Sequence, residues 1–183
     1  MTKTREEAIA LIAADELTHM PLEERGSLLL NWWGIDSDDI EYAALSDGVK
    51  NALAASPDGP ADPEDPKYDE LLQVAIRYEF FGVQNSYLET RLAKLGQVAV
   101  VAGFVEPLAR CPCCGYSSLR QRGEYDVCGV CFWEDDGGEA EEAWSGPNHM
   151  TLGEARKNFE SLGAVEEQFV SKVLPDGKER FYK

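Results

Sequence analysis

Two closely spaced pairs of cysteines constrain this chain more than any other feature. All five of its cysteines lie within 21 residues, from Cys111 to Cys131, in the stretch CPCCGYSSLRQRGEYDVCGVC. Cys111 and Cys114 form one C-x-x-C motif, Cys128 and Cys131 form a second, and residues 115–127 separate them. Four thiolates at ~2.3 Å complete the tetrahedral shell of Zn²⁺, and two tight turns are the usual way to present them. The spacing predicts a Zn²⁺ site in a small zinc-ribbon-like unit.

Two other uses of these thiols compete with zinc. Iron in a rubredoxin-like electron-transfer site takes the same four thiolates, and ligand softness alone does not separate the two metals. A redox pair is the second alternative, because Cys113 is a fifth thiol beside two of the expected ligands. The simpler interpretation of Cys113 is a small buried residue without a chemical role, and we favour it.

Length and cysteine usage indicate the compartment. A chain of 183 residues buries roughly 70% of its unfolded surface, so it does not need disulfides to fold. The cysteine count is odd, the first 20 residues show no basic-then-apolar pattern, and no apolar run reaches about 18 residues. We therefore expect a cytoplasmic protein with no membrane association, in which clustered thiols hold a metal.

The charge is strongly acidic: 34 carboxylates against 17 basic residues give a net charge of −17 and a pI near 4.4. Residues 36–70 hold eleven of the carboxylates and only Lys50 and Lys67, and residues 134–142 hold six and no base. Such a surface repels a phosphate backbone, so we expect no direct nucleic-acid binding. Solvated faces explain most charge runs. The alternative is a docking surface for a basic protein partner, with these candidates: Asp36, Asp38, Asp39, Asp62, Glu64, Asp65, Glu134, Asp135 and Asp136.

The first half of the chain has helical patterns. Thr4 and Glu7 form a capping box for a helix over about residues 4–19, and Pro21 suits the first turn of a second helix that ends at Gly34. A weaker helix over residues 38–55 precedes a long acidic loop, SPDGPADPEDP. The apolar stripe from residue 66 to 95 predicts the strongest helix, which Gly82 bends or splits.

The second half has mixed patterns. Residues 97–105, QVAVVAGFV, read as a short buried strand that leads into the cysteine segment. Thr151 and Glu154 form a second capping box, for a helix that Gly163 closes, and PDG at residues 175–177 predicts a final hairpin. We predict an α+β fold: a helical region over residues 1–96 packed with a zinc-binding region over residues 97–183.

Three segments resemble a known family. CPCCGY, YDVCGVCFWEDD and GPNHMTLGEARKNFESLGA, which occur in this order between Cys111 and Ala164, closely resemble the bacterial cysteine-rich CPCC family. The resemblance implies a small zinc-binding domain over these residues. Members of the family occur near polymorphic toxin systems, where immunity proteins reside, so the resemblance favours an immunity protein.

No catalytic residue is evident. Four cysteines close a zinc coordination shell, whereas a catalytic zinc keeps an open position. The two histidines, His19 at the end of an expected helix and His149 in a loop, have ordinary explanations. We therefore expect a protein-binding module rather than an enzyme, in the leading interpretation an immunity protein for a basic, nucleic-acid-targeting toxin. A structural or regulatory zinc ribbon with another partner is the alternative, followed by a thiol-based redox or hydrolytic enzyme.

Overall fold

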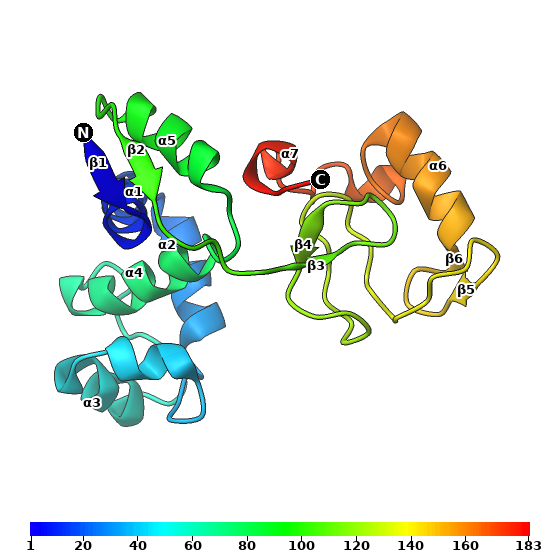
Figure 1. Cartoon of the computed structure of the whole chain (residues 1–183). Helices are drawn as coiled ribbons and strands as arrows, with labels where there is room; N and C mark the ends of the chain where they lie inside the picture. Colours follow the sequence, from blue (N-terminus) through cyan, green and yellow to red (C-terminus); the bar gives the residue numbers. More distant parts are fainter. The chain divides into compact units, whose positions relative to one another are not determined.

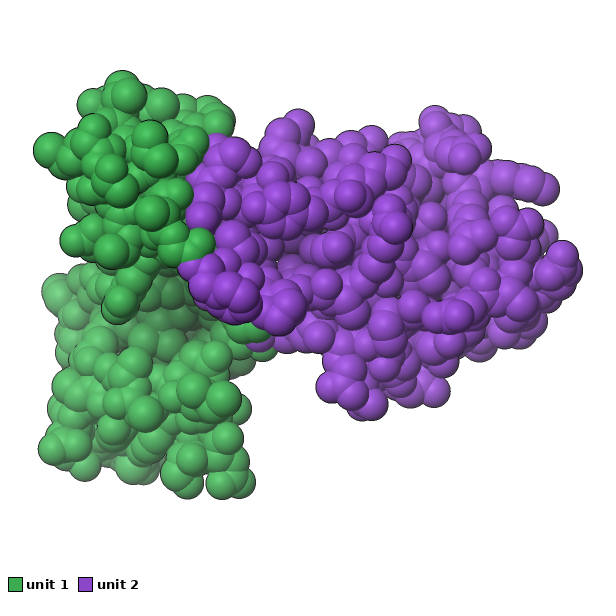
Figure 2. Space-filling view, in the orientation of Figure 1, with its two compact units in different colours: residues 1–81, 88–103 green, residues 82–87, 104–183 purple.

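A computed structural model describes all residues from 1 to 183 and divides them into two compact units. Unit 1 contains residues 1–81 and 88–103, and unit 2 contains residues 82–87 and 104–183, as coloured in Figure 2. Residues 97–103 therefore belong to the first unit, whereas the sequence placed the boundary after residue 96. The structure combines many helices with small two-stranded sheets, which confirms the predicted α+β class.

Helices dominate unit 1, and an apolar core forms within residues 29–74. The core contains Leu29, Trp33, Leu53, Tyr68 and Leu72, all of them buried. The elements, shown in Figure 1, are α1 (Arg5–His19), α2 (Leu22–Trp32), η1 (Ile40–Ala44), α3 (Asp47–Ala55), η2 (Pro66–Tyr68), α4 (Asp69–Tyr78) and α5 (Asn85–Lys94), the last of which begins with residues assigned to unit 2.

The start of α1 follows the predicted capping box. The Thr4 hydroxyl accepts a hydrogen bond from the Glu7 backbone N–H at 3.1 Å, and the Glu7 carboxylate accepts one from the Thr4 N–H at 2.8 Å. These bonds satisfy two backbone donors that the first turn of a helix leaves without partners. The residue types at Thr4 and Glu7 were therefore enough to predict where α1 begins.

The long helix predicted over residues 66–95 is interrupted, as its glycine suggested. A 3-10 turn and α4 end by Tyr78, and α5 begins only at Asn85. Gly82 lies between the two helices with φ of 69°, a left-handed conformation that glycine adopts without the steric cost of a side chain. The break therefore has an identified position and cause.

The strand expected over residues 97–105 is shorter and less buried than predicted. β2 covers only Val100–Ala102 and pairs in parallel with β1 (Thr2–Thr4), with Thr2 opposite Val100. Val101 is buried, whereas Val98 and Val100 are exposed. Alternate residues of β2 face solvent, so only one face of the strand packs against the protein, and β-branched composition overstated the burial.

Unit 2 contains two small hairpins and short helices. β3 (Ala109–Arg110) pairs antiparallel with β4 (Ser117–Leu119), and β5 (Trp144–Ser145) pairs with β6 (Met150–Thr151). The helices are α6 (Leu152–Leu162), η3 (Glu167–Phe169) and α7 (Gly177–Arg180). The capping box of Thr151 and Glu154 begins α6, and Gly163 ends it in the left-handed conformation, both as predicted.

The predicted hairpin around residues 175–177 is wrong. The chain forms the short helix α7 there, and the Asp176 carboxylate accepts a hydrogen bond from Arg180 Nε at 2.7 Å, one turn later. Gly177 is buried, and a Cβ at this position would lie 3.3 Å from Val130. Tertiary packing therefore overrides the local turn signal of PDG.

No helix of the protein combines the length and apolar character that crossing a bilayer requires.

Candidate metal centre

The first C-x-x-C motif lies in the tight turn between β3 and β4. The Gly115 N–H donates to the Cys111 carbonyl at 3.0 Å, and the Cys111 N–H donates to the Tyr116 carbonyl at 2.8 Å. Gly115 has φ of 80°, so the residue four positions after the first cysteine takes the left-handed conformation. We call residues 111–116 the first knuckle.

The second motif repeats this geometry with a different residue. The Phe132 N–H donates to the Cys128 carbonyl at 2.8 Å, and the Cys128 N–H donates to the Trp133 carbonyl at 2.8 Å. Phe132 has φ of 68°, a strained value for an aromatic residue, and its ring stacks on Phe169 at 4.4 Å. We call residues 128–133 the second knuckle. Gly129 serves packing instead, since a Cβ there would lie 2.8 Å from Leu174 Cδ1.

The two knuckles bring four sulfur atoms together. The Sγ atoms of Cys111 and Cys131 lie 3.7 Å apart, those of Cys114 and Cys128 lie 3.6 Å apart, and all four lie within 4.8 Å of one another. A tetrahedron with metal–sulfur bonds of ~2.3 Å has edges of ~3.8 Å, whereas a disulfide joins sulfurs at ~2.05 Å. The spacing fits four ligands around one ion, and all cysteines are free thiols.

The surroundings of Cys128 favour its thiolate form, whereas hydrogen bonds within the tetrad and burial raise the pKa of Cys114 and Cys131. All four cysteines are buried, the Val130 N–H donates to Cys128 Sγ at 3.4 Å, and Ser118 Oγ lies 3.0 Å from the same sulfur. Hydrogen bonds from Cys111, Cys114 and Cys131, together with Ser118, lower the pKa of Cys128 against the effect of burial. Donors of this kind orient and tune metal ligands. Metal ligation requires thiolates, so binding of a divalent cation would release thiol protons from the site.

Cys113 is buried but lies outside the group of four. The sulfur atoms that converge belong to Cys111, Cys114, Cys128 and Cys131, which are the four residues that the spacing predicted. The sequence paired Cys111 with Cys114 as one C-x-x-C motif and left Cys113 as a small buried residue. The first knuckle accounts for this pairing, because the sulfur of Cys114 lies 3.6 Å from that of Cys128 in the second motif.

Unit 2 is a small module with four convergent cysteines that can hold a metal ion. Residues 109–179 match the model of the family described as cysteine-rich CPCC. The resemblance expected from about residue 111 to 164 is thereby confirmed. No significant match was found among curated proteins or solved structures.

The acidic candidates of unit 1 lie on exposed turns. Asp36, Asp38 and Asp39 precede η1, where the Asp36 N–H donates to Asp39 Oδ2 at 3.0 Å and the Asp38 N–H donates to Asp36 Oδ1 at 2.8 Å. These bonds shape the turn and leave the side chains at the surface. The three side chains are therefore accessible to a partner, but the bonds do not bring their carboxylates together at one point.

The acidic loop before η2 is less uniform. Asp62 and Glu64 are exposed, but Asp65 pairs with Lys67 at 2.7 Å and caps η2. The hydrogen bond from Lys67 lowers the pKa of Asp65. Arg25 holds the same segment through Asp69 Oδ1 at 2.6 Å. Asp65 is thus a structural residue as well as a candidate for binding.

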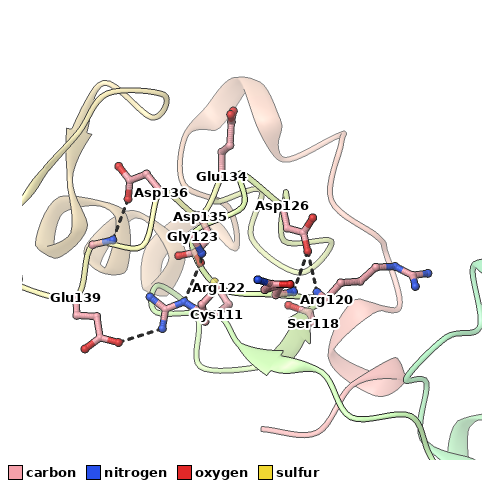
Figure 3. A network of polar contacts seen from close by, with 12 residues as sticks. Cys111, Ser118, Arg120, Arg122, Gly123, Asp126, Glu134, Asp135, Asp136 and Glu139 are labelled. Atoms are coloured by element: carbon pink, nitrogen blue, oxygen red, sulfur yellow. Dashed lines mark hydrogen bonds and ion pairs between the residues drawn. The ribbon is translucent and has the colours of Figure 1, made fainter.

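In unit 2, the structure corrects the assignment of Asp135 to a docking surface. Its side chain is completely buried and accepts hydrogen bonds from Arg122 Nε at 2.8 Å and from the Gly123 N–H at 2.7 Å (Figure 3). Alternation along the chain explains the difference, since Trp133 and Asp135 point inwards. Glu134 and Asp136 are partly buried, and the Glu134 side chain points away from this contact in Figure 3.

Sequence patterns did not single out Asn148, which directly precedes His149. The Asn148 side chain is buried, accepts from the Glu134 N–H at 3.0 Å and donates to the Glu134 carbonyl at 2.8 Å. It therefore pairs with the backbone after the second knuckle as a neighbouring strand would. His149 itself is exposed. The signal for Asn148 was weak, because its partner lies 14 residues earlier in the chain.

Proposed function

We propose that the four cysteines bind one Zn²⁺ ion and that its role is structural. The observation that carries this proposal is the set of sulfur separations, 3.6 and 3.7 Å, which match a tetrahedral tetrathiolate. Four protein ligands complete the shell, so the site offers no open position for a catalytic water. Elemental analysis of the purified protein tests the proposal: one zinc per chain supports it, and iron or no metal contradicts it.

The second part of the proposal concerns the partner. The zinc domain and unit 1 form a cytoplasmic module that binds a basic protein, and that partner is a cognate, nucleic-acid-targeting bacterial toxin, which the module neutralises as an immunity protein. Support comes from the CPCC match at residues 109–179 and from the net charge of −17. Basic clefts that bind nucleic acid attract an acidic protein and speed its association.

The proposed docking surface consists of exposed carboxylates. Asp36, Asp38, Asp39, Asp62 and Glu64 lie at the surface of unit 1, in the stretch that contributes −9 of the net charge. Glu134 and Asp136 remain weaker candidates because they are partly buried, and Asp135 is withdrawn. Charges at the edge of an interface act mainly on the association rate.

Charge reversal tests the docking surface. A double variant, Asp62→Lys with Glu64→Lys, should associate with the toxin more slowly, and added salt should shrink the difference from the parent. Glu23→Lys with Glu24→Lys is a matched control, since it makes the same change of charge at exposed residues elsewhere in unit 1. Salt-independent association of parent and variant would remove the electrostatic mechanism. If no toxin is neutralised in cells and no basic partner binds, a zinc-bearing regulatory module replaces the immunity protein.

A further inference from the structure

Three arginines line one pocket beside the first knuckle. The pocket has a volume of about 390 Å³, and its walls include Arg110, Arg122 and Arg156, together with Pro112 and Gly115 of the knuckle. All of these residues belong to unit 2. In a chain with a net charge of −17, such a concentration of guanidinium groups needs a physical reason.

Each guanidinium is held in place through its Nε atom. Arg110 Nε donates to the Gly115 carbonyl at 2.7 Å, Arg156 Nε donates to the Pro112 carbonyl at 3.0 Å, and Arg122 Nε donates to buried Asp135 at 2.8 Å. Anchoring at Nε leaves the terminal nitrogens free to face a ligand. Both Nη atoms of Arg110, and Nη2 of Arg122 and of Arg156, have no acceptor within the protein.

One possible role of these arginines is to balance the negative charge of the metal centre. A divalent ion with four thiolates carries two negative charges, and Cys111 also borders the pocket. However, no arginine donates a hydrogen bond to a cysteine sulfur, and the Cys111 residue exposes only 1% of its surface. The arginine donors are therefore directed to oxygen atoms and to the pocket, not to the tetrad.

Two glutamates occupy part of the donor set. Glu139 accepts from Arg122 Nη1 at 3.3 Å, and Glu141 accepts from Arg156 Nη1 at 2.9 Å, but their side chains are 79% and 65% exposed. Ion pairs this exposed contribute little, so an external anion can displace them. In the pair of Arg122 with Asp135, by contrast, the carboxylate is fully buried.

From these contacts we infer that the pocket binds the phosphate group of a small molecule. Several N–H donors that approach from three residues suit a tetrahedral oxyanion with several acceptor oxygens, and arginine makes strong, directional bonds to phosphate. The volume lies within the range of roughly 300–1,000 Å³ that is usual for small-molecule sites, so it leaves room for the group that carries the phosphate. This inference does not depend on a protein partner.

Calorimetric titration of the full, metal-loaded chain with inorganic phosphate and, separately, with a nucleoside monophosphate tests the inference at constant ionic strength. We expect saturable binding of both, tighter for the nucleotide if the rest of the pocket contacts its carrier. Arg110→Gln, which removes the arginine without a carboxylate partner, should weaken binding roughly tenfold. Lys172→Gln removes the same charge from an exposed site in unit 2 and should leave binding unchanged.

A second variant separates ligand binding from a merely structural role. Glu139→Gln removes a competing carboxylate, so phosphate affinity should rise about twofold to fivefold, which a structural role for the arginines would not produce. Absence of saturable binding by either ligand overturns the inference. So does a loss of zinc in Arg110→Gln with unchanged phosphate affinity, because the arginine would then serve the metal centre.

Discussion

The carboxylate of Asp135 exposes no surface to solvent, and one of its oxygens lies 2.8 Å from Arg122 Nε. The same oxygen accepts from the Gly123 N–H at 2.7 Å. Arg122 and Gly123 lie in the loop between the two knuckles, and Asp135 lies just after the second knuckle. The two bonds therefore hold this loop against the segment that follows the second knuckle. The hydrogen bond with Asp135 and the charge of that residue raise the pKa of Arg122 against the effect of burial.

Replacing Asp135 with asparagine should destabilise unit 2 by about 2–3 kcal/mol, because the change leaves buried polar atoms poorly matched while Arg122 keeps partial access to solvent. Denaturant unfolding, followed by tryptophan fluorescence, measures the change. Asp136→Asn is the matched control: its carboxylate accepts only from the Gly138 N–H at 3.2 Å and is partly exposed. Equal stability of the two variants would show that the buried ion pair does not hold the loop.

Replacing Cys128 with serine should remove the metal and unfold unit 2, while unit 1 retains its own core. Structural zinc contributes an apparent ~10–16 kcal/mol in small fingers, which exceeds the stability of most domains of this size. The metal-to-protein ratio and limited proteolysis together check this. Cys113→Ser should keep full metal content, and loss of metal in that variant would show that the wrong four ligands were chosen.

Replacing Gly115 with alanine should cost roughly 1–2 kcal/mol, because φ of 80° is unfavourable for any residue with a Cβ. A Cβ would meet no atom closer than 3.7 Å, so the cost is conformational and not steric crowding. Thermal unfolding of the metal-loaded protein measures it. Gly146→Ala, at a position with open space and no positive φ, should be neutral. An unchanged melting temperature for Gly115→Ala would argue against the first knuckle as described.

Asp176 should make the stability of unit 2 depend on acid pH. Burial raises the pKa of this carboxyl, but hydrogen bonds from Tyr87 and Arg180 outweigh it, and the net pKa lies below the usual 3.8. Because the pKa is lower in the folded state, the stabilisation is present above the unfolded-state pKa and is lost as the pH falls through the folded-state value. Asp176→Asn should cost about 1 kcal/mol near neutral pH, after allowance for solvent screening. The difference from the parent should shrink below about pH 4, and a constant difference would contradict the assignment.

Local signals in the sequence predicted local structure well. Both capping boxes, at Thr4 and Thr151, are present with their expected bonds, since the two residues of each box lie three positions apart. The cysteine tetrad was predictable for a related reason: metal chemistry restricts ligand type and spacing. Gly82 also interrupts its helix where the sequence suggested.

Features that depend on distant contacts were not predictable. The burial of Asp135 depends on Arg122, and the helix at Gly177 depends on packing against Val130. Phe132 takes a conformation that its residue type disfavours, because the second knuckle repeats the hydrogen bonds of the first. A pattern of residue types does not contain these partners, so charge runs alone assigned Asp135 to the surface.

The pairing of Thr2 with Val100 has a consequence for the order in which the protein is made. The first strand leaves the ribosome early, but its partner follows about 98 residues later, a delay of roughly 5–20 s at ordinary rates of synthesis. Until then β1 has an unpaired edge, and the sheet of unit 1 cannot form. The tetrad is complete within 21 residues of chain, so its loop closes as soon as Cys131 emerges. The sheet of unit 1 thus depends on a contact between distant parts of the nascent chain, whereas the ligands of the metal centre all lie within one short loop.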